Sequence, residues 1–369
     1  MIDKLLKNSI DFQLITNIED FISLRDEWND VLLKSGIQNA FLRHEWLCSW
    51  WKSYGKDKEL MILKFSRDGQ TIGFIPLMKY TTVLTGLKLK AIGFLTNHWT
   101  RMNFILASHT DECLESLAAY IKESKEIFIL AQMHREHEIY KKLGCILKEQ
   151  HISFAEQEKP HAYVDLKGTW EDYFNSQSRN FRMDSRRKLK RFEKEGAVRL
   201  ARSKGEDADK VLLQLKAIAQ NCWQAKDNVN IISTSEGFHF YQDICETTLK
   251  GSMLDFTVLT VDDKPVAYMV GLIQHDCYFA FDTAYDKNFE EFSPGLILHN
   301  LLMEELYKDK VRIFDFGFDA SYKKRWSSQT LITSDVVIFP RGIKSLVWRM
   351  GQQLKNLRKL IKSKEPKND

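Results

Sequence analysis

A chain of 369 residues with 44% hydrophobic content can bury a large core, and its length predicts two or three structural units. The six cysteines are widely scattered without a Cys-x-x-Cys pair, which argues against a zinc site or a disulfide framework and fits a reducing compartment. The net charge is +4, but residues 341–369 carry nine Lys/Arg and two Asp/Glu, whereas the rest carries 45 basic and 48 acidic residues. Total charge therefore gives no support to a nucleic-acid-binding protein.

The N-terminal stretch MIDKLLKNSIDFQLITNIED has no apolar core of signal-peptide length. No window approaches the roughly 18 uninterrupted apolar residues of a membrane span. We therefore expect a soluble, cytoplasmic protein.

The hydrophobic pattern predicts alternating helices and strands in the first part of the chain. We expect helices at 20–34, 43–54, 112–123 and 135–143, and strands at 60–65, 71–78, 87–94, 126–133, 145–154 and 161–166. The first two helices carry an unusual aromatic load, which we interpret as packing between helix and sheet: Trp28, Trp46, Trp50, Trp51 and Tyr54.

The second part of the chain repeats this plan. We expect helices at 169–195, 206–225, 235–250, 294–308 and 321–326, and strands at 256–261, 266–273, 277–285, 312–316 and 331–338. The stretches ILKFSRDGQTIGFIPL and FTVLTVDDKPVAYMVGL both predict a strand, an acidic turn and a strand, which indicates an internal repeat of low identity. The expected organisation is two halves, 1–160 and 161–340, followed by a basic amphipathic tail helix in 341–369.

A helix with a well-marked start is expected in FSPGLILHNLLMEEL, residues 292–306. Ser293 is placed to cap it and Pro294 stands at the first helical position. Such a start leaves backbone N–H groups free to bind an anion, although the same pattern also fits an ordinary capped helix.

Four stretches carry a resemblance to a known family: DKPVAYMVGL, YDKNFEEFSPGLILHNLLMEEL, FDFGFDASYKKRW and SQSRNFRMDSRRKLKRFEKEG. Together with the order of the predicted elements, they resemble the CelD/BcsL-type acetyltransferases. These are GNAT relatives often found with exopolysaccharide biosynthesis, and they are similar to the FemAB peptidyltransferases, which have two GNAT-like halves. The resemblance implies an α/β fold with a mixed sheet and two tandem GNAT-like halves. It also implies acetyl-CoA or another acyl-CoA as co-substrate, no metal, and an amine or hydroxyl of a small molecule or sugar as acceptor.

By this resemblance, strands 277–285 and 312–316 part to hold the donor, and its pyrophosphate meets the helix start at Ser293, Gly295 and Leu296. GNAT enzymes usually have a further glycine or alanine in this loop, whereas here Glu290 and Glu291 precede the single Gly295. Acids there would oppose phosphates. Either they turn outward, or coenzyme A is held partly elsewhere, or the donor is a different molecule.

A second candidate phosphate site lies in SRNFRMDSRRKLKRFEK, residues 178–194, which holds eight basic residues against two acids. Arg179, Arg182, Arg186 and Lys190 fall on one face of the expected helix. Arginine suits phosphate, and cations this dense repel one another unless an anion is near. We favour an anion site over a solvated basic face; the anion could be coenzyme A, a nucleotide-linked sugar, tRNA or lipid phosphate.

Asp315 lies on the strand that would border the transfer site. A partly desolvated carboxylate there could take a proton from the acceptor. By resemblance to FemAB enzymes and the leucyl/phenylalanyl transferase, Tyr322 could protonate the leaving thiolate and Lys323 could stabilise the oxyanion. The alternative is that Asp315 caps the next turn and pairs with Lys323.

In the first half, the loop TNHWTR places His98, Trp99 and Arg101 as candidate acceptor-binding residues, and an ordinary polar loop fits it equally well.

The sequence therefore predicts an acyltransferase that moves an acyl group from acyl-CoA to an amine or hydroxyl acceptor. Two rivals stay open: a FemAB-like transferase that uses aminoacyl-tRNA, which is the one case in which a nucleic acid would take part, and a non-catalytic protein of polysaccharide assembly or the membrane surface. Residues 343–362 combine an apolar stripe with Lys/Arg, a pattern typical of interfacial membrane helices. Simple docking of this helix on the body is the slightly favoured alternative to peripheral contact with the inner face of the membrane.

Overall fold

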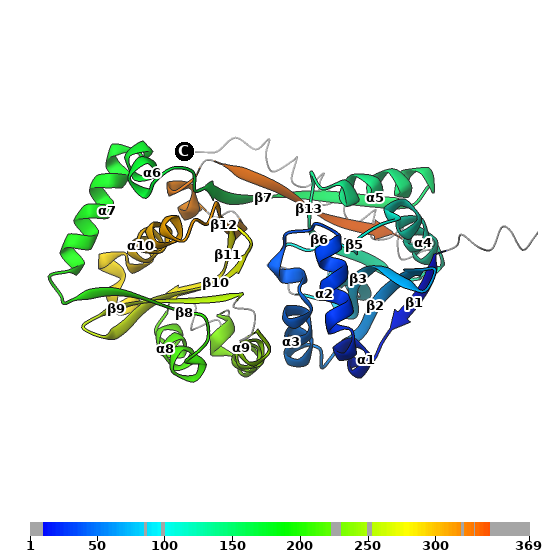
Figure 1. Ribbon diagram of the computed structural model, residues 1–369, viewed down its shortest axis with the longest axis horizontal. Coiled ribbons are helices and arrows are strands. Elements are labelled where there is room, and N and C mark those ends of the chain that lie inside the picture. Colours follow the sequence, from blue (N-terminus) through cyan, green and yellow to red (C-terminus); the bar gives the residue numbers. More distant parts are fainter. Residues whose placement is uncertain are drawn as a thin grey trace, which may run out of the picture.

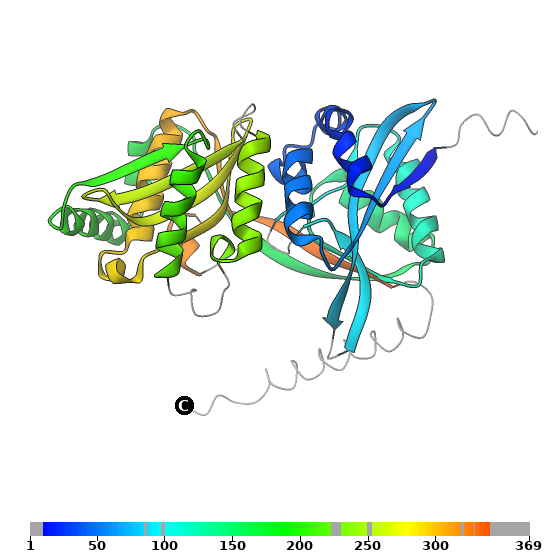
Figure 2. The ribbon, with the colours of Figure 1, turned by 90° about the horizontal axis from the view of Figure 1, so that it is seen from below.

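The computed structural model describes residues 10–84, 87–96, 100–222, 230–248, 253–318, 321–327 and 329–339. The described strands form one 13-stranded mixed sheet in the order β1-β2-β3-β4-β6-β13-β7-β12-β11-β10-β9-β8, with β5 paired to β3 (Figure 1). Helices cover the sheet in two lobes, which Figure 2 shows from a second direction. The predicted mixed α/β class is confirmed, whereas the predicted tail helix at 341–369 lies outside the described residues.

The N-terminal half contains the following elements. They are β1 (Asp11–Ile15), α1 (Ile18–Ser23), α2 (Arg25–Lys34), η1 (Ala40–Leu42), α3 (His44–Tyr54), β2 (Glu59–Arg67), β3 (Gln70–Leu84), β4 (Leu87–Phe94), β5 (Ile105–Leu106), α4 (Thr110–Glu123), β6 (Ile127–His134), α5 (Glu138–Glu149) and β7 (Ser153–Asp165).

The C-terminal half follows a similar order. Its elements are α6 (Trp170–Ser176), α7 (Arg179–Phe192), β8 (Val198–Ser203), α8 (Ala208–Gln220), η3 (Ile231–Ser233), α9 (Ser235–Thr248), β9 (Leu254–Val261), β10 (Lys264–Gln274), β11 (Cys277–Tyr285), η4 (Lys287–Phe292), α10 (Pro294–Lys308), β12 (Ile313–Phe318), η5 (Ser321–Arg325) and β13 (Thr330–Phe339).

The two predicted hairpins are both present, as β2–β3 and β9–β10. Each turns on two residues with positive φ: Asp68 and Gly69 at 51° and 76°, and Asp262 and Asp263 at 45° and 64°. Positive φ at both central residues is typical of the tight turns that match the strand twist. The hairpins therefore support the predicted repeat.

In each half, the strand after the hairpin has a short parallel neighbour. Residues 91–93 of β4 pair with 127–129 of β6, and residues 277–279 of β11 pair with 313–315 of β12. Beyond residue 279, β11 continues to Tyr285 without β12 beside it. The parallel strands of the C-terminal half therefore part, as the family resemblance implies for 277–285 and 312–316.

Strands β7 and β13 join the two halves. β7 pairs with β12 through residues 161–165 and with β13 through 153–162, while β13 also pairs with β6. In Figure 1 both strands run side by side from one lobe to the other. The last described strand therefore returns to the sheet of the N-terminal half, and the sheet is continuous across the molecule.

Several predicted elements differ from the structure. The helix expected at 20–34 is two helices, α1 and α2, and the strand expected at 161–166 is the end of β7. A strand was expected at 145–154, but α5 continues to Glu149 and β7 begins at Ser153. Ile146 and Leu147 continue the buried face that Leu143 begins, so packing extends the helix. The helix expected at 169–195 is two helices, because the Ser178 side chain accepts a hydrogen bond from the backbone N–H of Phe181 at 3.2 Å and starts α7 anew.

The core confirms the interpretation of the tryptophans. Trp28 is fully buried, stacks on Phe74 with ring centroids 4.6 Å apart, and donates from Nε1 to the Leu42 carbonyl at 2.8 Å. Trp46 of α3 packs edge-on against Phe240 of α9 with ring centroids 4.9 Å apart. Helices α3 and α9 therefore carry the contact between the lobes.

Candidate active site between β11 and α10

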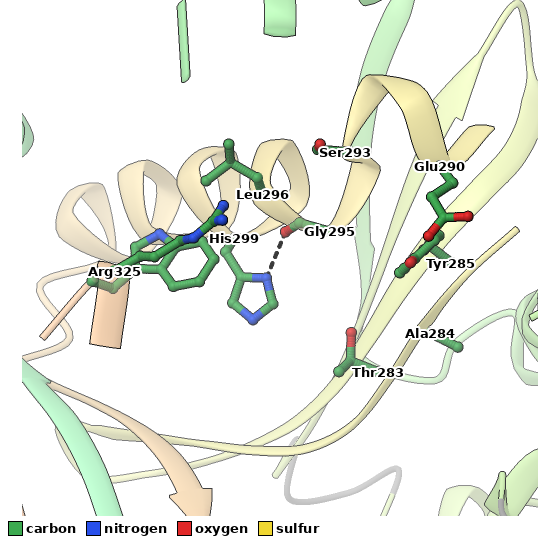
Figure 3. Close-up of a pocket in the computed structure, with 10 residues that line it drawn as sticks. Thr283, Ala284, Tyr285, Glu290, Ser293, Gly295, Leu296, His299 and Arg325 are labelled. Atoms are coloured by element: carbon green, nitrogen blue, oxygen red, sulfur yellow. Dashed lines mark hydrogen bonds between the residues drawn. The ribbon is translucent and has the colours of Figure 1, made fainter. Parts of the chain in front are cut away.

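A cavity of about 470 Å³ lies where β11 and β12 part. Its walls come from the end of β11, the start of α10 and the short helix η5 (Figure 3). The lining residues are Thr283, Ala284, Tyr285, Glu290, Ser293, Gly295, Leu296, His299, Arg325 and Trp326. The structure thus brings together Ser293, Gly295 and Leu296, the three residues predicted to meet the donor's pyrophosphate.

The start of α10 differs from the expected cap. Ser293 has a left-handed conformation with φ of 56°, and its side chain makes no capping hydrogen bond. Its backbone carbonyl instead accepts from the N–H of Leu296 at 2.9 Å. Pro294 at the first helical position has no N–H to satisfy, and no side chain caps the N–H groups of the first turn, which faces the cavity.

Gly295 leaves room on the cavity side of the helix. A Cβ placed on it would lie 3.9 Å from Cδ1 of Tyr285, which is ordinary van der Waals contact. The fold itself therefore does not require a glycine here. A ligand held close against this backbone would require one.

His299 is a cavity residue that the sequence reasoning missed. Its Nδ1–H donates to the Gly295 carbonyl at 2.6 Å, and its ring points from α10 into the space facing β11 (Figure 3). Burial lowers its pKa to about 4, so the ring is neutral at pH 7 and Nε2 is a hydrogen-bond acceptor. The available signal in the sequence was a histidine among the apolar residues of the expected helix, and that pattern is equally typical of an ordinary buried side chain.

The two acids before α10 have different surroundings. Glu291 pairs with Arg191 of α7, and its carbonyl accepts from Lys188 Nζ at 2.6 Å. Glu290 lines the cavity beside Tyr285, whose pKa is raised by burial and then by that carboxylate. One alternative that the sequence left open was that both acids turn outward. Glu291 does so, whereas Glu290 lines the cavity in which the donor is expected.

Two residues of the predicted cationic face of α7 contact α6, and three of its four residues, Arg179, Arg186 and Lys190, are exposed. Arg182 donates to the Asn175 carbonyl, and the Arg186 guanidinium lies 5.3 Å from the centre of the Phe174 ring. Arg186 also borders a separate cavity of about 120 Å³ between α6, α7 and α10. Arg179 is exposed at the first position of α7. None of these three arginines lines the larger cavity, whose one basic lining residue is Arg325 of η5, while Lys188 and Arg191 contact Glu291 just before α10.

Asp315 is buried on β12 at the junction of the halves, 3% exposed. It pairs with Arg101 of the N-terminal half, and its Oδ1 accepts from the N–H of Gly317 at 2.8 Å. The Arg101 guanidinium also lies 5.3 Å from the centre of the Phe279 ring on β11. The structure therefore joins a predicted acceptor-binding residue to the predicted base, a pairing that no sequence spacing indicates.

The remaining predicted site residues are described only in part. Lys323 donates from Nζ to the Phe316 carbonyl at 2.6 Å, which places it against β12. Tyr322 belongs to η5, but its side chain lies outside the described part of the chain. His98 and Trp99 also lie outside it. Within the described residues, no group of three or more His, Cys, Asp or Glu is arranged to hold a metal ion.

Comparison with known proteins supports this geometry. The acetyltransferase (GNAT) domain family matches residues 179–324, which include β11, α10, β12 and the cavity lining except Arg325 and Trp326. That match spans less than half of the chain. No curated protein sequence matches it.

Solved structures resemble the whole chain, well beyond the GNAT domain. FemX is 12% identical, with 94% of this chain and 99% of that chain covered and a TM-score of 0.57. L-PGS from Bacillus licheniformis is 14% identical, with 88% and 96% covered and a TM-score of 0.56. A conserved protein of unknown function from Bacteroides thetaiotaomicron is 15% identical, with 89% and 99% covered and a TM-score of 0.53. At such identities, the likeness shows that the two-lobed fold is shared.

Proposed function

We propose that the protein transfers an acyl group from acyl-coenzyme A to an amine or hydroxyl acceptor. The observation that carries this proposal is the cavity between the parted strands β11 and β12, bordered by the start of α10 within a GNAT domain. Parted strands leave backbone N–H and C=O groups unpaired, and these suit the amides of a pantetheine chain. The N-terminus of a helix suits the pyrophosphate that follows it.

We assign the other predicted site residues to parts of this donor as proposals. Gly295, Ser293 and Leu296 would contact the pyrophosphate, while Tyr322 and Lys323 stay predicted partners of the leaving thiolate and the oxyanion. The binding of coenzyme A phosphates by Arg179, Arg182 and Arg186 also stays a prediction; these residues would reach a phosphate at the outer end of the donor.

Replacing Gly295 with alanine is expected to weaken donor binding and leave the fold intact. The added methyl group has room when the cavity is empty, and a helical Gly→Ala change stabilises a helix by roughly 0.5–1 kcal/mol. With coenzyme A bound against this backbone, the methyl group would occupy its space and lower the affinity about tenfold or more. Isothermal titration calorimetry with coenzyme A measures the effect.

Gly144 provides the matched control for this variant. It lies within α5, far from the cavity in sequence and fold, and a Cβ on it meets nothing within 4 Å. Gly144→Ala should therefore raise helix stability in the same way without changing coenzyme A affinity. Equal affinities of Gly295→Ala and Gly144→Ala for coenzyme A would contradict the proposed donor site.

The rival donor, an aminoacyl-tRNA, has one observation in its favour. Glu290 lines the cavity where phosphates are expected, and the basic residues of α7 do not line it, although Arg325 of η5 does. Release of free thiol from acetyl-coenzyme A separates the two donors, because an aminoacyl-tRNA enzyme would release none.

We also propose that the protein takes part in cell-envelope or exopolysaccharide biosynthesis, and that it is located in the cytoplasm at the inner face of the membrane. No helix among the described residues has the length and apolar character to cross a membrane. The helix expected at 343–362, on which membrane contact would depend, lies outside the described part of the chain.

A further inference from the structure

The cavity of about 120 Å³ between α6, α7 and α10, which we call the α7 cavity, is separate from the larger cavity proposed for the donor. Different residues of α10 line the two spaces. Gly295, Leu296 and His299 line the larger cavity, and Ile297, Asn300, Leu301 and Glu304 line the α7 cavity. Because successive residues of a helix turn by about 100°, these two sets lie on opposite faces of α10.

The wall of the α7 cavity is mostly apolar. Its carbon surface comes from Trp170 and Phe174 of α6, Leu189 of α7, and Ile297 and Leu301 of α10. An engineered apolar cavity of about 150 Å³ is known to bind benzene. The α7 cavity, at about 120 Å³, therefore has room for roughly five carbon atoms. Water gains little in such a space, because each buried water molecule needs roughly two to four polar partners.

One hydroxyl group in this apolar wall has no partner. Ser185 of α7 is 5% exposed and lines the cavity, and its Oγ makes no hydrogen bond within the described part of the chain. A serine inside a helix can donate to the carbonyl four residues earlier, but Ser185 does not. A buried hydroxyl group without a partner destabilises the folded state, so Ser185 indicates a ligand that supplies the missing hydrogen bond.

The open side of the α7 cavity is cationic. Arg186 lines the cavity and is exposed, and no carboxylate among the described residues pairs with it. Glu304 is the one acid in the lining, and its carboxylate lies 3.5 Å from Nζ of Lys308. Arg179 and Lys190, exposed on the same helix, add to the positive potential. This charge favours a ligand with an anionic head group.

Asn300 offers a further hydrogen-bond donor to such a head group. Its Oδ1 accepts from Nε1 of Trp326 at 2.9 Å, which fixes the orientation of the amide, and its Nδ2 donates to no described residue. The Ser185 hydroxyl and the Asn300 amide can therefore each donate to an oxygen of a carboxylate. Hydrogen bonds to a charged acceptor are stronger than those between neutral groups.

We propose that the α7 cavity binds a short-chain carboxylate, with an aliphatic chain of roughly five carbon atoms. The chain lies among the apolar side chains of α6 and α10, and the carboxylate accepts from Ser185 and Asn300 and faces Arg186. This inference goes beyond the proposed function, because the α7 cavity is occupied independently of the donor that the protein uses.

Four small probes separate the contributions of chain and head group. Pentanoate, pentan-1-ol and pentylamine share one chain, and acetate has the head group without it. Each is titrated into the full-length protein by calorimetry at up to about 20 mM, because a ligand of this size is expected to bind with a Kd of about 1 mM. Pentanoate should bind about tenfold more tightly than each of the other three probes.

Two variants place the binding in the α7 cavity. Ser185→Val fills part of the space and removes the unpaired hydroxyl group, so it should raise the Tm and weaken pentanoate binding about tenfold or more. Ser185→Ala keeps the space open and should also raise the Tm, with a loss of affinity of about tenfold. Ser116 provides the matched control, because it lies inside α4 and its Oγ already donates to the Glu112 carbonyl at 2.9 Å. Ser116→Ala should leave pentanoate affinity unchanged.

Three outcomes overturn the proposal. Absence of pentanoate binding by wild-type protein means that the α7 cavity holds water only. Equal pentanoate affinity of Ser185→Val and wild type places the binding elsewhere on the molecule. Pentylamine that binds as tightly as pentanoate excludes the anionic class of ligand. None of these titrations contains coenzyme A, so their failure leaves the proposed acyl transfer standing, and thiol release from acetyl-coenzyme A tests that function separately.

Discussion

Replacing Arg101 with methionine is expected to lower the free energy of unfolding by about 3–5 kcal/mol, the usual cost of removing one partner of a buried ion pair. Asp315 is 4% exposed at its side chain and Arg101 18%, so the carboxylate would lose its counter-ion in a place that water scarcely reaches. Because the pair joins β12 to the N-terminal half, the loss should also loosen the junction of the lobes. Urea unfolding followed by tryptophan fluorescence measures the change.

Two further variants show whether the effect comes from this pair. Arg101→Met combined with Asp315→Asn should recover part of the loss, because the uncompensated charge is then gone. Arg199→Met, which removes a partner of the exposed Asp263, should change stability little. If Arg101→Met were as stable as Arg199→Met, the ion pair would not hold the two halves together.

Acid is expected to destabilise the protein through its buried histidines. Burial lowers the pKa of His161 and of His299 to about 4, whereas an unfolded chain has a histidine pKa of about 6.5. Between these values the unfolded state binds more protons, so the free energy of unfolding falls as the pH drops from 6.5 towards 4. Each histidine contributes about 1.4 kcal/mol per pH unit across this window.

The histidines and Asp282 change the free energy of unfolding in opposite directions as the pH falls. Asp282, with its raised pKa, acts in the opposite direction below pH 6, because its folded form holds the proton more tightly. His299→Gln should reduce the pH dependence of stability by about one proton, while Asp282→Asn should steepen it. Urea unfolding at pH 5, 6 and 7 gives both slopes, and an unchanged slope in His299→Gln would mean that this ring binds its proton equally in the folded and unfolded states.

Local sequence patterns predicted the elements that depend on local physics. The acidic turns at 67–70 and 262–265 specified hairpins, because Asp and Gly tolerate the positive φ that a tight turn requires. Pro294 marked the start of α10, and the period of apolar residues marked its length. The parting of β11 and β12 came from resemblance, because no local pattern tells a chain where two strands stop pairing.

Side-chain partners that lie far apart in the sequence could not be predicted from the sequence. Asp315 and Arg101 lie more than two hundred residues apart in sequence, and only the return of β7 and β13 across the sheet brings their surroundings together. Asp282 sits in CYFAFDTAY much as Asp315 sits in FDFGFD, a carboxylate within an aromatic strand. The two carboxylates differ in their partners: a guanidinium pairs with Asp315, and two hydroxyl groups donate to Asp282. These partners come from elements distant in the sequence.

The most direct test of the central claim is a crystal structure of the protein grown with coenzyme A. The account predicts the pantetheine chain between β11 and β12, with the pyrophosphate against the backbone of Gly295. Coenzyme A bound elsewhere, such as along α7 alone, or a cavity that stays empty at millimolar coenzyme A, would contradict it.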